Sequence, residues 1–322
     1  MRVTAVLMAY NQEAIVHSAA QSVLAQDYPE LDVVFSDDHS TDRTLQVLQR
    51  IAAEYRGPHR VRVRQNSHNL VMRHMPTVVE ELDTPLVIQF HGDDLAVPHR
   101  VSRVVAEYKR TGASLIGSGA MQIDADGKPL GRYQTGAPWR WTGPLDFIRG
   151  AWGGHFLGAT LSYEPRLYRA PFPALDPTKL ASGNDVILPF RAALQGGLAY
   201  IEEPLVLYRR HPGQLSYDLA DWTHGRAAFD ETVAAHHLML QCQRLRDLDA
   251  LFAAGQNPAN HDALATATRA GIVDATVAWA ERRATAMHSE LRPIWVTRDV
   301  YRSLQEKAGV GRPRPAAAGV KR

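Results

Sequence analysis

Adjacent aspartates occur twice in the first hundred positions, and each pair lies shortly after an apolar run. The first pair is Asp37 and Asp38, and the second is Asp93 and Asp94. Two neighbouring carboxylates repel each other, which makes such a pair costly at a strand end unless a ligand uses it. Both pairs therefore indicate binding chemistry.

The first pair belongs to the segment Ser36–Thr44, which separates an apolar run from a stretch of helical periodicity. Asp38 could accept the N–H of a pyrimidine base, while Asp37 could hold the surrounding turn. In the alternative interpretation every polar residue here is a helix cap or turn former, with Ser40 or Thr41 as the N-cap. Binding is favoured because a strand-to-helix turn is a preferred ligand position in α/β proteins.

The second pair ends the segment Gln89–Asp94, whose sequence is QFHGDD. A divalent cation that bridges two phosphates needs hard oxygen ligands, and carboxylates at a strand end leave coordination positions open for the diphosphate. Asp93 is therefore the first candidate metal ligand and Asp94 an additional one, while Gly92 permits close backbone approach. The alternative is an Asp-Asp helix cap before Pro98.

A third acidic position, Asp185, lies at the start of a helical pattern. An acceptor hydroxyl has a pKa far above 7, so it attacks poorly unless a carboxylate takes its proton in the transition state. Asp185 is the candidate for that general base, and Arg191 on the same predicted helix is a further candidate site residue. By position alone, Asp185 could instead be a favourable partner of the helix dipole.

The segment Tyr208–His211 brings two arginines and a histidine after the last predicted strand. Arg209 could neutralise the charge that develops on a departing diphosphate, and His211 could be a further metal ligand. Exposed arginines are usually solvated and a lone histidine is usually structural, which is the alternative for both.

The elements that must position these side chains alternate between short apolar runs and stretches of helical period as far as about residue 120. Such alternation predicts an α/β fold with a mostly parallel twisted sheet, helices on both faces, and ligands at the carboxyl ends of the strands. The expected strands are Val3–Met8, Asp32–Phe35, Val61–Arg64, Leu86–Phe90 and Leu115–Ile116, and the expected helices are Ala14–Ala25, Arg43–Tyr55, Pro76–Leu82 and His99–Thr111.

The pattern beyond residue 120 is less regular. Asp124–Gly127 predicts a hairpin turn rather than a calcium loop, because the third acidic position and the distant glutamate of such a loop are missing. The Gly-, Pro- and Trp-rich stretch Gly131–Pro177 is typical of an irregular wall beside a site, or of buried aromatics in a connecting loop. The later expected elements are a helix at Asn184–Leu194 and two strands at Leu198–Ile201 and Pro204–Tyr208.

The chain is long enough for one large domain and an appendage. We expect the large domain over residues 1–217 and a helical C-terminal region over residues 218–309, with interruptions around Gly255–Pro258 and at Pro293. Residues 310–322 contain four basic residues and no acidic one, which predicts a disordered basic tail.

The composition is that of an ordinary globular protein, with 45% apolar and 22% charged residues. The net charge of +2 gives no reason to expect a nucleic-acid partner, because phosphate backbones are bound by dense clusters of Lys and Arg. The single cysteine, Cys242, fits a reducing compartment, and no run approaches the ~18 to 20 apolar residues of a membrane span. We therefore expect a cytoplasmic protein without a transmembrane segment, whose contact with a membrane would be peripheral.

Several well-known catalytic motifs are missing from the sequence. There is no Gly-x-x-x-x-Gly-Lys-Ser/Thr loop, no Gly-x-Gly-x-x-Gly after the first strand, no Gly-x-Ser-x-Gly elbow and no paired-cysteine metal site. Kinases, dinucleotide oxidoreductases and serine hydrolases are therefore disfavoured.

Taken together and in this order, the segments resemble the inverting glycosyltransferases of family 2, which have the Rossmann-like GT-A fold. The resemblance covers about two-thirds of the chain, and the ordered set is far more specific than any one motif. The residues that carry it are Val6–Asn11, Ser36–Thr44, Asn66–Asn69, His91–Asp94, Gly183–Asp185 and Glu203–His211.

The resemblance implies a role for each acidic position. The first acidic turn holds the nucleoside, the second holds Mg²⁺ or Mn²⁺ on the diphosphate, and the later Asp is the base of a single in-line displacement that inverts the anomeric carbon. These roles fall on Asp38, Asp93 and Asp185. The implied nucleotide-binding residues are Ala9, Tyr10, Asn11, Asp37, Asp38, Asn69, His91 and Gly92.

The sequence departs from the family pattern at the metal motif. His91 replaces the usual first Asp, so coordination would rest on Asp93 with help from His211 or water, and His91 could face the donor ribose. The other departures are His39 for a usual Gly, Asn184 for a usual Glu, and Leu70 and Val71 for a usual small residue after Asn69.

These observations predict an enzyme that moves a sugar from a UDP- or dTDP-type donor to an acceptor hydroxyl, in bacterial surface polysaccharide or glycoconjugate synthesis. The expected acceptor is a carbohydrate or glycolipid, and a homo-oligomer or contact with the inner face of the membrane stays open. One rival is a sugar-phosphate nucleotidyltransferase, which would need a Gly-rich basic turn that Tyr10–Glu13 lacks. The other is a non-catalytic module that binds nucleotide sugars.

Overall fold

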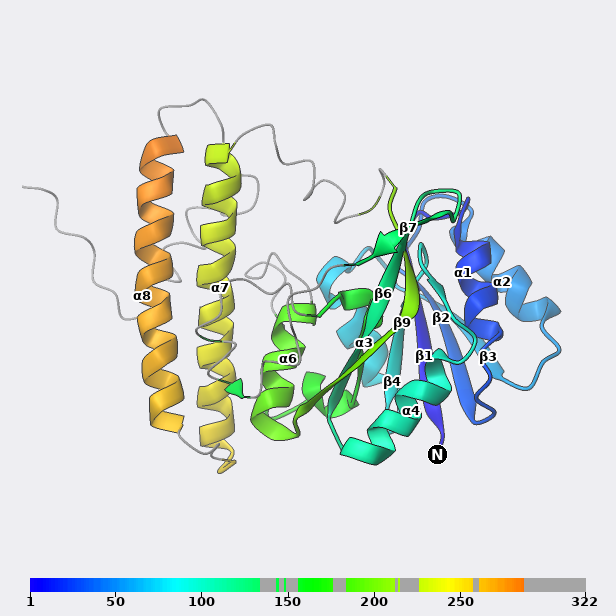
Figure 1. Ribbon diagram of the computed structural model, residues 1–322, viewed down its shortest axis with the longest axis horizontal. Helices are drawn as coiled ribbons and strands as arrows, with labels where there is room; N and C mark the ends of the chain where they lie inside the picture. Colours follow the sequence, from blue (N-terminus) through cyan, green and yellow to red (C-terminus); the bar gives the residue numbers. More distant parts are fainter. Residues whose placement is uncertain are drawn as a thin grey trace, which may run out of the picture.

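The computed structural model describes residues 1–133, 143–144, 148, 156–175, 184–211, 214, 226–256 and 261–286. Within these ranges the chain forms a nine-stranded sheet with helices on both faces and a pair of long helices at one side (Figure 1). The predicted domain boundary near residue 217, the site segment 182–183, Pro293 and the basic tail 310–322 lie outside the described residues, as do the tryptophans of the stretch Gly131–Pro177.

The first half of the sheet is parallel, as the alternating pattern predicts. Its strand order is β3-β2-β1-β4, and every neighbouring pair in this half is parallel. Because parallel neighbours run in the same direction, their carboxyl ends meet at one edge of the sheet. The strands are β1 (Val3–Ala9), β2 (Leu31–Asp37), β3 (Arg60–Gln65) and β4 (Val87–His91).

The second half of the sheet is mixed, which the sequence pattern did not predict. The short strand β8 (Ser162–Tyr163) lies antiparallel between β4 and β6 (Leu115–Ile123), and β6 pairs in parallel with β9 (Leu198–Arg209). The remaining strands are antiparallel: β5 (Leu95–Ala96) on β9, and β7 (Pro129–Arg132) on β6.

Two expectations concern this half. The hairpin turn at Asp124–Gly127 is confirmed, because Gly127 donates its N–H to the carbonyl of Asp124 between β6 and β7. The two strands expected at Leu198–Ile201 and Pro204–Tyr208 form the single strand β9. The residues between them are absorbed by a shift in the β6–β9 register opposite Gly119, where a side chain would collide with the Glu202 carbonyl oxygen.

Alternating side chains of β1 bury two separate cores. Val3, Ala5 and Leu7 pack in the core that contains α1, α2 and α4, whereas Val6 packs on the opposite face with α3 and α6. Both faces of a parallel sheet must be covered, which explains why β1 is apolar at every position except Thr4. The helices are α1 (Val16–Leu24), α2 (Thr44–Glu54), α3 (His74–Glu80), α4 (Arg100–Thr111) and α6 (Asn184–Gln195).

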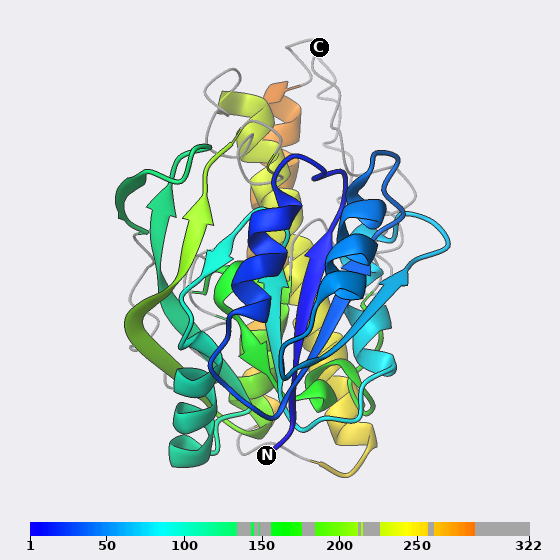
Figure 2. The ribbon, with the colours of Figure 1, turned by 90° about the vertical axis from the view of Figure 1, so that its right-hand side faces the viewer.

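The long helices α7 (Arg226–Ala253) and α8 (His261–Ala286) pack against each other and lie behind the sheet in Figure 2. In Figure 1, α6 lies between the sheet and α7. Leu188 of α6 shares a buried cluster with Leu248 of α7 and Leu264 of α8. The helical pair is therefore joined to the rest of the protein through the helix that carries Asp185. None of the described helices is long and apolar enough to cross a membrane.

Candidate active site

The two acidic pairs lie on either side of β1, at the carboxyl edge of the sheet. The register places Ala9 opposite Asp37 and Met8 opposite His91. The backbone continues this pairing beyond the strands, since Asp38 donates its N–H to the Ala9 carbonyl at 2.9 Å and Gly92 donates its N–H to the Met8 carbonyl at 2.8 Å. The parallel topology thus brings together residues that are more than fifty positions apart in the chain.

Gly92 is required by this close approach. A Cβ at this position would lie 3.1 Å from the Ala9 Cβ, 3.2 Å from the Met8 carbonyl oxygen and 2.3 Å from Oε1 of Gln12. The expectation that Gly92 permits close backbone approach therefore holds, and the neighbouring backbone is that of β1.

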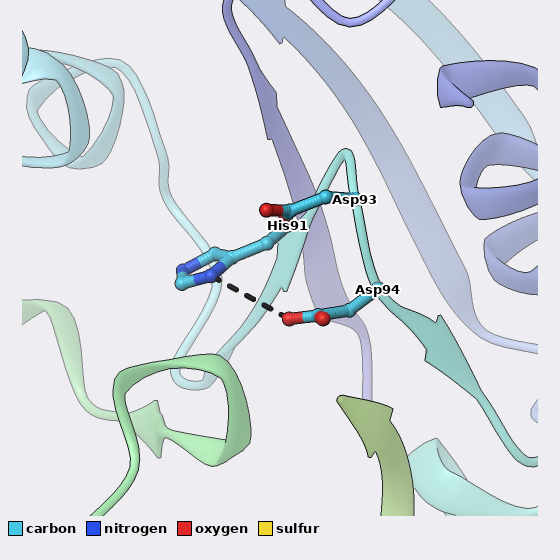
Figure 3. Close-up of side chains that lie close together, drawn as sticks. All are labelled: His91, Asp93 and Asp94. Atoms are coloured by element: carbon cyan, nitrogen blue, oxygen red, sulfur yellow. Dashed lines mark ion pairs between the residues drawn. The ribbon is translucent and has the colours of Figure 1, made fainter. Parts of the chain in front are cut away.

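Three side chains after β4 form a cluster that could hold a metal ion. His91, Asp93 and Asp94 each offer a ligand atom, and these atoms lie within 4.8 Å of one another. Figure 3 shows all three side chains projecting to the same side of the turn. The Nε2 of His211 lies 3.2 Å from Oδ2 of Asp93, so the end of β9 adds a fourth group. The structure brings Asp93 and His211 together, as metal binding requires.

The two carboxyl groups of this cluster are in different electrostatic states. Burial and the neighbouring charge of Asp93 raise the pKa of Asp94 well above its ordinary value. Burial also acts to raise the pKa of Asp93, but the hydrogen bond from His211 contributes most to bringing it below its ordinary value. The Oδ2 atom of Asp94 is buried and has no hydrogen-bond partner among the described residues.

This donor set fits a divalent cation. Carboxylate oxygens with imidazole nitrogen suit Mn²⁺, and a buried carboxylate oxygen without a partner is costly unless a cation or proton occupies it. Burial lowers the pKa of His91, which favours the neutral ring that a metal ligand must be. The Oδ2 of Asp94 is open to a cation, whereas the Nε2 of His211 is engaged with Asp93 and the Nε2 of His91 accepts a hydrogen bond from Gln89 at 2.9 Å, so either ring must give up a hydrogen bond to bind the metal through Nε2.

Arg209 holds the turn Gly92–Asp94 in place. Its backbone N–H donates to Oδ1 of Asp94 at 2.8 Å, and its Nε donates to the Asp93 carbonyl at 2.9 Å. Its Nη1 donates to the Ala125 carbonyl at 2.6 Å, which ties the turn to the β6–β7 hairpin. The guanidinium is buried and donates its hydrogen bonds to backbone carbonyl groups, so Arg209 is a positioning residue rather than a cation open to a diphosphate.

The carboxylate of Asp38 organises the loop after β3. Its Oδ1 accepts hydrogen bonds from the Asn66 amide at 2.6 Å and the Leu70 N–H at 2.9 Å, and its Oδ2 accepts from the Val71 N–H at 2.9 Å. A carboxylate offers about four acceptor positions, so little capacity remains for a base edge. The loop also contains Asn69, whose Oδ1 accepts the same Val71 N–H at 3.0 Å.

Asp37 has a free oxygen at the same edge. Its Oδ2 accepts hydrogen bonds from the Ser40 N–H at 2.9 Å and the Gln65 amide at 3.1 Å, which holds the turn as expected. Its Oδ1 is buried without a hydrogen-bond partner in the described part of the chain. Asp37 therefore has an unused acceptor in the described part of the chain, although its side chain is fully buried.

The loop after β1 is clamped to the turn after β2. Asn11 has a φ of 51°, and its side-chain oxygen accepts the Thr41 N–H at 2.8 Å. Tyr10 beside it is 41% exposed. His39, which stands where the family has Gly, has a φ of 65°, a left-handed conformation that Gly adopts freely and His tolerates at some cost. The N-cap residue of the helix that follows is Arg43, so neither Ser40 nor Thr41 caps it, and Oδ1 of Asp42, one residue earlier, accepts the Thr44 N–H at 2.9 Å.

A buried polar network beneath Asp38 was missed by sequence reasoning. The Nε2 of His74 lies 2.7 Å from the Ser36 hydroxyl, which also accepts a hydrogen bond from Arg64 at 2.7 Å. Burial lowers the pKa of His74 to about 4, although the charge of Asp38 acts to raise it. The ring is therefore neutral at pH 7, and its contact with Ser36 helps to hold the first acidic turn.

Asp185 lies at the first turn of α6, next to Gly158 of the 3₁₀ turn η3 (Gly158–Thr160). A Cβ on Gly158 would lie 3.7 Å from Oδ2 of Asp185, which shows how closely the two approach. Burial raises the pKa of Asp185 to about 6, while the backbone N–H groups of Asp185 and Gly158 act to lower it. A carboxyl group with a pKa near the working pH is well matched to general base catalysis.

Gln89 connects Asp185 to the metal cluster, and sequence reasoning missed it. Its Nε2 donates to the Gly158 carbonyl at 3.1 Å and to Nε2 of His91 at 2.9 Å. Arg100 adds a second connection, because its Nη2 donates to the carbonyls of Gln89 and Ala159. The available signal was a polar residue within an otherwise apolar run, Leu86–Phe90.

Arg191 lies outside the site. Its guanidinium is fully buried and makes a two-point ion pair with Asp247 of α7, with both N–O distances at 2.9 Å. It also donates to the carbonyls of Leu167 and Pro173. Every one of its contacts is structural, so the structure gives no support to the expectation that Arg191 serves a ligand. A helical position alone could not distinguish these roles.

Comparison with known sequences matches residues 4–163 to the family described as glycosyl transferase family 2. EpsE of Bacillus subtilis, which carries a glycosyltransferase name, is 27% identical over 128 residues, or 39% of this chain and 45% of EpsE. The uncharacterised glycosyltransferase alr2836 of Nostoc sp. is 22% identical over 217 residues, or 66% of this chain and 65% of that protein. The matched regions thus span less than two-thirds of each relative's own length.

Solved structures with a similar fold include residues 1–349 of Staphylococcus aureus TarS in complex with UDP-GlcNAc. The TM-score is 0.53 at 16% identity, and the match covers 88% of this chain and 92% of TarS 1–349. The mannosyltransferase PcManGT from Pyrobaculum calidifontis, in complex with GDP-Man and Mn²⁺, gives a TM-score of 0.52 at 16% identity, covering 95% of this chain and 84% of that one. This likeness confirms the expected GT-A fold.

Proposed function

The chain belongs to glycosyl transferase family 2, and on that premise we propose that it transfers a sugar from a nucleoside-diphosphate donor to an acceptor hydroxyl, with inversion at the anomeric carbon. The observation that carries this proposal is the path of contacts from Asp185 through Gly158 and Gln89 to His91. It joins a candidate base to a candidate metal cluster at one edge of the sheet.

Asp185 takes the proton of the acceptor hydroxyl in this proposal. Its raised pKa, about 6, makes it a stronger base than an ordinary Asp, while it remains largely ionised at pH 7.5. Inversion needs no protein nucleophile, because the acceptor oxygen displaces the diphosphate in one step.

Asp93, Asp94 and His211 would hold a divalent cation, Mg²⁺ or Mn²⁺. When bound, the cation supplies charge neutralisation for the departing diphosphate. Arg209 keeps the two carboxylates in position through its contacts with the same turn.

The nucleoside is assigned to the edge formed by the loops after β1, β2 and β3. Tyr10 offers an exposed aromatic ring, and Asp37 offers a buried oxygen without a partner among the described residues. Asp38 fixes the Asn69–Val71 loop beside them. A carboxylate acceptor suits the N–H of uracil or thymine, so we propose a UDP- or dTDP-type donor; TarS was solved with UDP-GlcNAc and PcManGT with GDP-Man.

The biological setting belongs to the same proposal. We place the reaction in the cytoplasm, at or near the inner face of the membrane, in the synthesis of a bacterial surface polysaccharide or glycoconjugate. The acceptor is a carbohydrate or glycolipid.

A panel of UDP-, dTDP- and GDP-sugars, assayed with Mn²⁺, with Mg²⁺ and with EDTA, tests the proposal. We expect one donor to raise the melting temperature only with metal, and its nucleoside diphosphate to be released when an acceptor pool is added. Asp185→Asn should retain the donor-dependent shift and lose transfer, whereas Asp27→Asn, at an exposed position, should retain both. Pyrophosphate release from a nucleoside triphosphate, or donor binding without turnover in any pool, would refute it.

A further inference from the structure

Gln89 is the polar residue in the middle of β4 that no part of the proposed chemistry uses directly. It is 3% exposed, and the rest of the strand is apolar until His91. A buried amide is tolerated only when its donors and acceptor are hydrogen-bonded, so its partners indicate why it is there.

All of the polar groups of Gln89 are engaged. The side-chain Nε2 donates to the Gly158 carbonyl at 3.1 Å and to Nε2 of His91 at 2.9 Å, and Oε1 accepts the Tyr163 hydroxyl at 3.2 Å. The backbone N–H donates to the Leu161 carbonyl at 3.1 Å. Gln89 thus binds β4 to the segment Gly158–Tyr163 from both main chain and side chain.

The orientation of the amide is fixed by chemistry. The Gly158 carbonyl can only accept, so the NH₂ end of Gln89 must face it and the oxygen must face the Tyr163 hydroxyl. The second N–H of the same NH₂ group then points at Nε2 of His91, which must be the acceptor. A neutral His91 therefore carries its proton on Nδ1, the atom that lies 3.8 Å from Oδ2 of Asp94.

The same amide also restrains the base. Gly158 lies directly beside the Asp185 carboxylate, and its carbonyl is held by Gln89. A movement of Gln89 would therefore displace Gly158 relative to Asp185 and release the ring of His91 at the same time. The candidate base and the candidate metal cluster lie on different elements, α6 and the turn after β4, and the Gln89 side chain links them through Gly158.

We propose that Gln89 is a positioning residue for sugar transfer, which sets the place of the Gly158–Asp185 pair and the tautomer of His91 through one amide group. This inference rests on the proposed function for its kinetic consequence. Its structural consequence, the protonation of His91 on Nδ1, does not depend on any activity.

Two substitutions separate shape from hydrogen bonding. Gln89→Glu retains the size of the side chain and, when ionised, loses both donors, while Gln89→Met removes the polar atoms. The matched control is Gln26→Met, because Gln26 is also buried and its side chain makes three hydrogen bonds, to Ser22, Val97 and Val101, none of which belongs to the site. Thermal unfolding of all three variants shows whether they fold.

For the kinetic readout, we expect both Gln89 variants to lower kcat by about 10- to 100-fold and to change the donor KM by less than about threefold, because small displacements of reacting groups cost such factors. Gln26→Met should lower the melting temperature by a similar amount and leave kcat within about twofold. A Gln89 variant with kcat equal to that of Gln26→Met overturns the kinetic part of the proposal.

For the structural readout, ¹⁵N NMR of histidine-labelled protein, with His91→Asn to assign the signal, reports which ring nitrogen of His91 is protonated. We expect the Nδ1–H form in the unsubstituted protein and a mixture of forms in both Gln89 variants. An Nε2–H form in the unsubstituted protein overturns the proposal even if transfer is observed. If no donor is turned over but the Nδ1–H form is found, the proposed function fails and the hydrogen-bond network stands.

Discussion

Replacing Asp185 by Asn should make the protein more stable at neutral pH while it abolishes transfer. Burial raises the pKa of this carboxyl group from 3.8 to about 6, so the folded protein binds the proton more tightly than the unfolded chain does. The stability that this group contributes is therefore present at low pH and is lost as the pH rises through about 6. An amide cannot ionise and avoids that loss.

The magnitude follows from the shift. A displacement of about two pKa units corresponds to about 3 kcal/mol between the two protonation states. Asp185 is only partly buried, and Asn retains one acceptor in place of two, so we expect a net gain of about 1 to 3 kcal/mol at pH 7.5. By pH 4 the folded group is protonated in the parent protein as well, and the gain should fall below about 1 kcal/mol.

Urea unfolding of the parent, Asp185→Asn and Asp27→Asn at pH 7.5, 6, 5 and 4 measures this directly. The exposed Asp27 provides the control for loss of one negative charge, and its substitution should have little effect at any of these values. Equal stability of Asp185→Asn and parent at pH 7.5, or a gain that persists undiminished at pH 4, would refute the reasoning. The kcat of the parent should fall with decreasing pH below about 6, because the base becomes protonated.

Three further perturbations test other parts of the structure. Asp247→Ala leaves Arg191 buried without its charge partner and should lower the free energy of unfolding in urea by about 3 to 5 kcal/mol. Arg103→Met should lower it by less than about 1 kcal/mol, because the ion pair of Arg103 is half exposed. Equal losses in the two variants would contradict this expectation. Asp93→Asn should abolish the Mn²⁺-dependent rise in melting temperature, and an undiminished rise would count against the metal cluster. Val71→Gly should raise stability by about 1 kcal/mol, because Val71 has a φ of 48° and a largely exposed side chain; a loss of stability would show that the conformation is not strained.

The parallel half of the sheet was predictable from the sequence, and so was the position of the two Asp pairs at its carboxyl edge. Apolar runs of strand length alternate with helical periods, which determines the parallel connection, and acidic pairs at two strand ends must then meet at one edge. Asp93 lies beside His211 as metal binding requires, although the two are 118 positions apart. The assignment of Asp93, Asp185 and the nucleotide-binding residues to catalysis is still a proposal.

The antiparallel strands were not predictable in the same way. β8 has two residues and β5 has two, so neither contains enough alternation to reveal a strand. The sequence predicted two strands in place of β9, because Glu202–Pro204 interrupts the apolar run. In the structure, the register shift opposite Gly119 lets the strand continue. These strands form because they pair with adjacent strands of the sheet, and local sequence periodicity does not reveal such pairing.

The sequence by itself determined which residue types stand at the ends of the strands, because apolar periodicity and the acidic pairs are local properties of the chain. The tertiary structure decided what each charged or polar group does. Arg191 and Arg209 were both cations beside a predicted site, yet one pairs with Asp247 and the other holds the carbonyl of Asp93. The sequence indicated no role for Gln89, and only the fold brings Gly158 and His91 within hydrogen-bond reach of its NH₂ group. The reason is physical: the energy of a buried polar group depends on the partners within hydrogen-bond reach, and those partners come from distant segments.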